Sequence, residues 1–108
     1  MDIIMDVEDA MSRLGNNKKL YMLLLKKFNG AAMLEDLKNS LAGGDTEAAA
    51  AHAHTIKGLA ANLSFKDLQA KALAVELALK SGGADTAEIS ESMAATEEAV
   101  RAWISGNE

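Results

Sequence analysis

The feature that most constrains the fold is a helical spacing of leucine and alanine that runs through most of the chain without a proline. Of the 108 residues, 49% are hydrophobic, only 4% are aromatic and none is proline. Alanine and leucine favour helices, whereas β-branched and aromatic residues favour strands. Apolar residues recur every three or four positions, as in Leu68, Ala72, Val75 and Leu79. The sequence therefore predicts an all-α protein.

Glycine pairs and capping residues divide this pattern into segments. We expect five helices, over residues 6–14, 18–42, 46–63, 65–81 and from 85 onward. Short connections force successive helices to run antiparallel. We therefore predict an up-down-up-down antiparallel four-helix bundle with a short extra N-terminal helix. A chain of this length is enough for one domain, over residues 1–108.

Two local patterns carry specific expectations. The apolar phase continues through Asn29-Gly30 without a jump, so we expect one long helix there despite the turn signal. Ser64 followed by Asp67 fits a capping box, which predicts that Ser64 caps the next helix.

Composition excludes several classes of protein. The net charge of −5 argues against nucleic-acid binding, and the absence of cysteine excludes disulfides and thiolate metal sites. No apolar run approaches the roughly 20 residues of a membrane span. We therefore expect a cytoplasmic protein without a membrane association.

Both histidines lie on the helix expected over residues 46–63. At about 100° per residue, His52 shares the side that we expect to be buried with Ile56, Leu59 and Leu63. His54 is about 200° away from His52, so it should face solvent. Side chains two residues apart on a helix do not face each other, so the two imidazoles cannot chelate one metal. We expect no metal site.

The neighbours of His54 on the helix indicate that its side chain has a functional role. Lys57 and Gly58 share its face, with Ala61 a turn further on. A mid-helix glycine costs about 1 kcal/mol relative to alanine, and a side chain at this position would lean back over the imidazole. Lys57 offers a cation to an anion bound at the ring. A solvated surface histidine remains the alternative interpretation from spacing alone.

The segment AHTIKGLAANL, residues 53–63, closely resembles the signature of histidine-containing phosphotransfer (HPt) domains. Residues 14–28 resemble the family's entry into its second helix, and residues 41–45 resemble the turn before its active helix. The resemblance covers most of the chain. One departure is Ser64, which stands where the family usually has a glycine, so the shape of that turn is open.

The resemblance implies a phosphocarrier of a two-component phosphorelay. By this resemblance His54 is phosphorylated on Nε2, Lys57 stabilises the phosphoryl oxygens and Gly58 provides clearance. Glu76 falls beside the histidine, where it could accept a hydrogen bond from Nδ1–H, and Lys80 follows one turn later. The implied partners are response-regulator receiver domains or a hybrid histidine kinase.

The same resemblance predicts a protein without kinase activity or a cofactor of its own. The sequence has no Walker loop and no nucleotide-binding glycine loop. Mg²⁺ is expected only on the partner receiver domain.

Three other interpretations remain open. The sequence could be an HPt module cut from a hybrid or chemotaxis kinase. It could also be a helical adaptor or dimerisation bundle without covalent chemistry, which leucine and alanine stripes alone would support equally well. A metal or haem site inside the bundle needs inward-facing ligands on several helices, and only His52 is placed inward.

Overall fold

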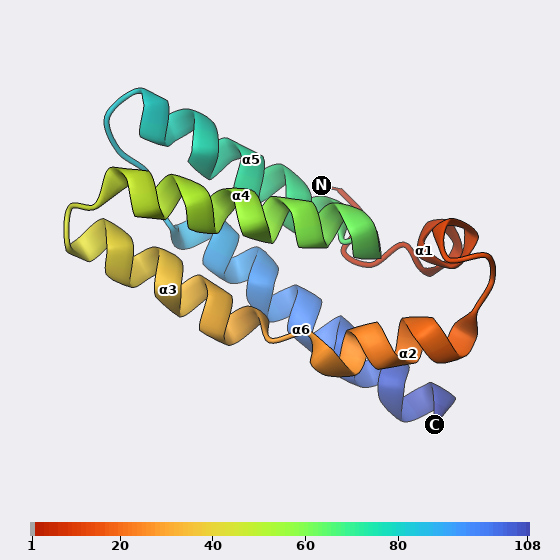
Figure 1. Cartoon of the computed structure of the whole chain (residues 1–108). Helices are drawn as coiled ribbons and strands as arrows, with labels where there is room; N and C mark the ends of the chain where they lie inside the picture. The colour runs from red at the N-terminus through yellow and green to blue at the C-terminus, as the bar shows by residue number, and fades with distance from the viewer. Residues whose placement is uncertain (1) are drawn as a thin grey trace.

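The computed structural model describes residues 2–108, which form six helices and no strand (Figure 1). The helices are α1 (Val7–Arg13), α2 (Lys18–Lys27), α3 (Gly30–Ala42), α4 (Thr46–Leu63), α5 (Lys66–Lys80) and α6 (Ala87–Asn107). This confirms the predicted all-α class. None of these helices is both long and apolar enough to span a lipid bilayer.

Helices α3 to α6 form the bundle. Each of them packs against two others, because α4 lies between α3 and α5 while α6 closes the ring against both. Figure 1 shows α2 extending the bundle at one end, against the C-terminal part of α6, with α1 beside it. The predicted antiparallel bundle with a short leading helix is therefore confirmed.

Small side chains occupy much of the buried side of α4, which packs against α3 and α5. Ala49, Ala53 and Ala60 on α4 and Ala72 on α5 are completely buried. The predicted apolar stripe of α5 is also buried. The buried line of α4 is centred on its alanines, so His52 and Leu59, which we expected to be buried, are half-buried at its edge.

The side-chain caps at the starts of α2 and α4 explain where these helices begin. The side-chain oxygens of Asn17 and Asp45 accept hydrogen bonds from the backbone N–H groups of Leu20 and Ala48, both at 3.0 Å. Such caps satisfy backbone donors that have no partner inside the helix. Both elements begin where the sequence predicts.

The expected long helix over residues 18–42 is wrong, because it breaks after Lys27 into α2 and α3. Phe28 adopts an extended conformation, with φ −66° and ψ 120°, and its ring packs edge-on against Phe65 at 5.1 Å between centroids. Asn29 caps α3 through its side chain, which accepts a hydrogen bond from the N–H of Ala32. The turn signal at Asn29-Gly30 prevails over the continuous apolar phase.

Gly30 explains why the break is at this point. A Cβ added to Gly30 would lie 2.3 Å from Sδ of the buried Met93 on α6. Glu97, also on α6, accepts a hydrogen bond from the N–H of Ala31 at 2.5 Å. The start of α3 is therefore fixed by close contact with α6, which a single-helix pattern does not reveal.

The expected capping box at Ser64 is also wrong. Ser64 ends α4 in the left-handed conformation, with φ 59°, and the N-cap of α5 is Phe65, which makes no side-chain cap. The buried Oγ of Ser64 donates a hydrogen bond of 2.6 Å to Oδ2 of Asp9 on α1. This bond is the main cause that lowers the pKa of Asp9. Ser64 thus occupies a conformation that favours glycine and uses its hydroxyl to hold α1.

We predict that Ser64→Ala lowers the free energy of unfolding by about 1–2 kcal/mol, because the bond to a charged carboxylate is lost while the left-handed backbone remains. Ser64→Gly should lose about 1 kcal/mol less than Ser64→Ala, since glycine adopts positive φ without strain. Urea denaturation followed by circular dichroism measures both. Equal stabilities of the two variants would show that the left-handed backbone at position 64 does not cost free energy in a non-glycine residue.

Candidate functional site

His54 stands on the solvent face of α4, near the middle of the helix. Its side chain is 70% exposed, whereas His52 is half-buried. The neighbours on the same face, Ala51 and Gly58, are exposed as well. The predicted outward position of His54 is confirmed, and any partner can approach the imidazole directly.

Glu76 reaches this face from α5 and contacts two residues of α4. Its Oε1 lies 2.8 Å from Nζ of Lys57, and its Oε2 lies 3.6 Å from Nδ1 of His54. The first distance is that of a close ion pair, and the second is longer than a hydrogen bond. The Glu76 side chain is only 17% exposed. The carboxylate therefore lies between the imidazole and the ammonium.

The electrostatics of this group favour an ionised carboxylate. The close contact with the Lys57 ammonium is the largest cause that lowers the pKa of Glu76, and His54 contributes in the same direction. Glu76 is therefore anionic at neutral pH and sits on the Nδ1 side of the ring. The other ring nitrogen, Nε2, remains available for chemistry.

Gly58 leaves open space beside the histidine. Apart from the adjoining residues and backbone of α4 itself, a Cβ added here would meet no atom within 4 Å. An alanine would therefore fit in the free protein, and the space matters only for a longer side chain or for a molecule that docks on this face. No packing contact of the bundle needs a glycine at this position.

The two remaining predicted residues lie at the edges of the site. Ala61 is half-buried one turn beyond Lys57 on α4. Lys80 is exposed at the C-terminal end of α5 and forms no ion pair within residues 2–108. The structure therefore brings together His54, Lys57 and Glu76, and does not bring Lys80 into contact with them.

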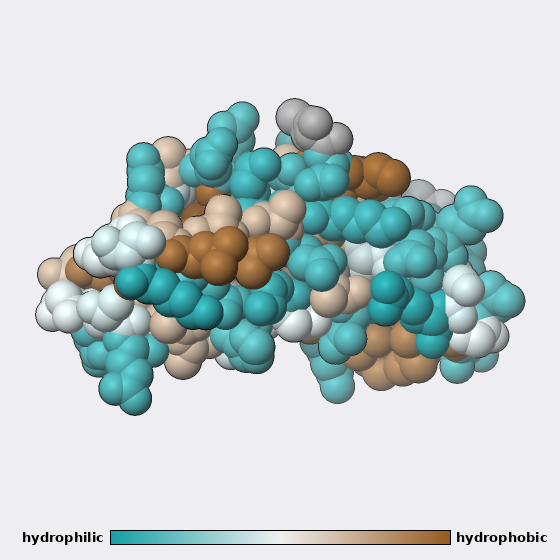
Figure 2. Space-filling model, turned by 90° about the horizontal axis from the view of Figure 1, so that it is seen from above, coloured by the Kyte–Doolittle hydropathy of each residue, from teal (hydrophilic) through white to brown (hydrophobic). Residues whose placement is uncertain are grey.

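Two exposed leucines of α5 were not identified from the sequence. Leu73 and Leu77 are 43% and 54% exposed, and they lie on the turns around Glu76. They do not fall at the helical positions of the buried apolar stripe of α5. Leucines outside that stripe are the sequence signal that could have revealed them. Seen from above, apolar side chains form small separate patches on a hydrophilic surface (Figure 2).

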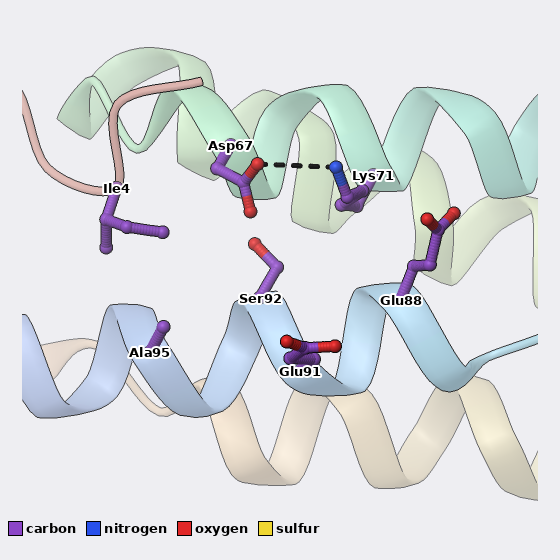
Figure 3. Close-up of a pocket in the computed structure, with 7 residues that line it drawn as sticks. All are labelled: Ile4, Asp67, Lys71, Glu88, Glu91, Ser92 and Ala95. Atoms are coloured by element: carbon purple, nitrogen blue, oxygen red, sulfur yellow. Dashed lines mark hydrogen bonds and ion pairs between the residues drawn. The ribbon is translucent and has the colours of Figure 1, made fainter. Parts of the chain in front are cut away.

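The site is a surface rather than a pocket. A hollow of about 220 Å³ lies between α5 and α6, lined among others by Asp67, Lys71 and Ser92 (Figure 3). Asp67 and Lys71 form an ion pair at 3.3 Å there, and His54 does not line this hollow. Within the described chain, no group of three or more His, Asp or Glu residues could hold a metal ion. His54 therefore lies on an open surface, where a partner could cover the ring from outside.

The comparison with protein families identifies the chain. A family model, the Hpt domain, matches residues 28–104. The chain belongs to the Hpt domain family, whose members are phosphocarriers in phosphorelays rather than kinases. Neither the search of curated proteins nor the search of solved structures found a match.

We predict that Glu76→Gln weakens the pH dependence of stability in acid. Because the folded pKa of Glu76 is lowered, its stabilisation is complete above the unfolded value of 4.5 and is lost as the pH falls through the folded pKa. At pH 7 the variant should lose about 0.5–1 kcal/mol, since the pair with Lys57 is partly exposed.

Urea denaturation at pH 7 and pH 3.5 tests this expectation. The matched control is Glu35→Gln, which changes an exposed glutamate of α3 that forms no ion pair in the described residues. The difference between the two pH values should shrink for Glu76→Gln and stay as in the wild type for Glu35→Gln. An identical pH dependence in all three proteins would show that the ion pair does not contribute.

Proposed function

We propose that the protein is a phosphorelay carrier that accepts a phosphoryl group on Nε2 of His54 from a receiver-domain aspartate or a kinase and passes it to another receiver aspartate. The observation that carries this proposal is an exposed imidazole on a helix face with open space at Gly58 and a carboxylate on its Nδ1 side. Membership of the Hpt family supports it.

The reaction needs no proton transfer before attack. The lone pair of Nε2 in the neutral imidazole attacks phosphorus, the bond between phosphorus and the aspartyl oxygen breaks, and the aspartate leaves as a carboxylate. The ring, still protonated on Nδ1, becomes cationic. Glu76, 3.6 Å from Nδ1, would stabilise that positive charge by approaching the N–H. The return transfer reverses these steps.

Lys57 would serve the phosphoryl group. In the free protein its ammonium pairs with Glu76 at 2.8 Å, and its side chain is 27% exposed. A lysine side chain is flexible, so Nζ can exchange a carboxylate oxygen for a phosphoryl oxygen without moving the backbone. Lys80 would add positive charge at the edge of the same face. Ala61, which has a small side chain, would leave that face open to the partner.

The receiver domain would supply the remaining parts. Phosphoryl transfer depends on positioning and on charge stabilisation in line with the leaving group. We expect the receiver's own Mg²⁺ to provide much of the latter and this chain to need no cofactor or ATP. Leu73 and Leu77 offer an apolar contact beside Glu76 for that docking.

The first prediction for this function compares the two histidines. Incubation with a phosphorylated receiver domain should produce acid-labile, alkali-stable phosphate on the wild type and on His52→Gln, and none on His54→Gln. The paired variants carry the same substitution two residues apart on one helix, so a general loss of folding would affect both. Phosphate retained by His54→Gln would contradict the assignment of the acceptor.

A second prediction separates stability from docking at position 58. Gly58→Ala should raise the free energy of unfolding by about 1 kcal/mol, because the helix gains a better helix former in open space. Gly58→Leu should keep most of this gain but lower kcat/KM for transfer from the receiver about tenfold or more, since the longer side chain holds the partner away from the ring.

Urea denaturation and quenched transfer assays on the same protein samples measure the two effects. Transfer by Gly58→Leu at the rate of the wild type would show that the open space has no role in docking.

A further inference from the structure

The outer face of α2 has a composition that packing inside this chain does not explain. Four lysines, Lys18, Lys19, Lys26 and Lys27, and no acidic residue lie on this ten-residue helix, and all four are exposed. Leu20 and Leu23 are 37% and 48% exposed among them. We define the α2 outer face as Lys19, Leu20, Leu23, Lys26 and Lys27, which cover about 120° of the helix.

The opposite side of α2 already anchors the helix. Tyr21 and Leu25 are buried, and the ring of Tyr21 packs edge-on against Trp103 of α6 at 5.0 Å between centroids. The exposed leucines are therefore not needed to hold α2 in place. Leucines left in solvent beside a helix that is already anchored indicate a surface available to a partner.

Charge separation strengthens this conclusion. The four lysines give α2 a charge of +4, so the rest of a chain with net charge −5 carries −9. Among the described residues, only Lys26 of α2 has a carboxylate partner, Glu108 at 2.8 Å. Apart from that pair, the outer face is a cationic surface with an apolar centre, complementary to an acidic surface with an apolar slot.

We propose that the α2 outer face is a second docking surface, which selects receiver domains that present an acidic patch around an apolar slot. The inference rests on the proposed phosphocarrier function. The family model begins at residue 28, so α2 lies just outside the matched core. A specificity element there leaves the shared chemistry around His54 unchanged.

The distance between the two surfaces along the bundle is within the span of one receiver. The molecule is 42 Å long, and about 14 Å of helix separate His54 from the end of α4, beyond which α2 extends (Figure 1). A receiver of ordinary domain size is about 30 Å across.

Two other occupants fit the face less well. A symmetric pair of chains that meet at α2 would bring lysines against lysines, which is repulsive. An anionic lipid surface would attract the lysines, but only two leucines could insert, and the rest of the chain, at −9, would be repelled. A protein partner can place its acidic patch on α2 alone.

The experiment measures kcat/KM for transfer from a panel of purified phosphorylated receiver domains, in low and high salt. The test variants are Lys27→Glu and Leu23→Ser on α2. The matched control is Lys38→Glu, the same charge reversal at an exposed lysine of α3. Circular dichroism and urea denaturation check that each variant is folded.

We expect Lys27→Glu and Leu23→Ser to lower kcat/KM about tenfold for the preferred acidic receiver and to leave poorly acidic receivers unchanged. Lys38→Glu should behave as the wild type. The preference of the wild type for acidic receivers should weaken in high salt, which tests the inference without any variant.

Failures of the two proposals are distinguishable. Wild-type protein that gains no phosphate from any receiver overturns the phosphocarrier function and the inference with it. Normal transfer with equal rates for Lys27→Glu, Leu23→Ser and Lys38→Glu overturns only the role of α2. Binding of the wild type, but not of Lys27→Glu, to phosphatidylglycerol vesicles with unchanged transfer rates overturns the inference in favour of lipid.

Discussion

The close packing of α4 on α5 is the constraint on which the site depends. Fully buried alanines at positions 49, 53 and 60 of α4 and at position 72 of α5 keep the buried sides of these two adjacent helices small, so the helices can approach closely. Because α5 lies so near, the short side chain of Glu76 reaches Lys57 and approaches His54. Larger residues along this seam would move the carboxylate away from the ring without changing any residue of the site.

Much of this arrangement was predictable from the sequence because it depends on local rules. The caps at Asn17 and Asp45 and the helical phase set the beginnings of α2 and α4, and the spacing of His54 from the apolar stripe gives its exposure. The turn signal at Asn29-Gly30 marked the break at Phe28, but the competing apolar spacing left it undecided, and the role of Ser64 was not predictable. Each depends on a contact with a distant element, α6 for Gly30 and α1 for Ser64.

The site also combines features that local sequence predicts with features that depend on contacts between helices. His54, Lys57 and Gly58 lie on one helix, so residue spacing relates them correctly. The pairing of Lys57 with Glu76 crosses two helices, and the sequence alone gives Lys57 no partner other than an incoming anion. In the structure the lysine already has a carboxylate partner. The free site is therefore a charge-balanced ion pair beside the imidazole, rather than a lysine without a partner.

This balance suits a carrier better than a storage site. If His54 takes a phosphoryl group, about two negative charges arrive beside Glu76, which is already anionic, and Lys57 can neutralise only part of them. A more cationic site would hold the phosphoryl group more tightly and slow its departure to the next aspartate. Under the proposed function, a Lys57 shared between Glu76 and the phosphoryl oxygens would favour neither the loaded nor the empty state strongly, which would allow transfer in both directions.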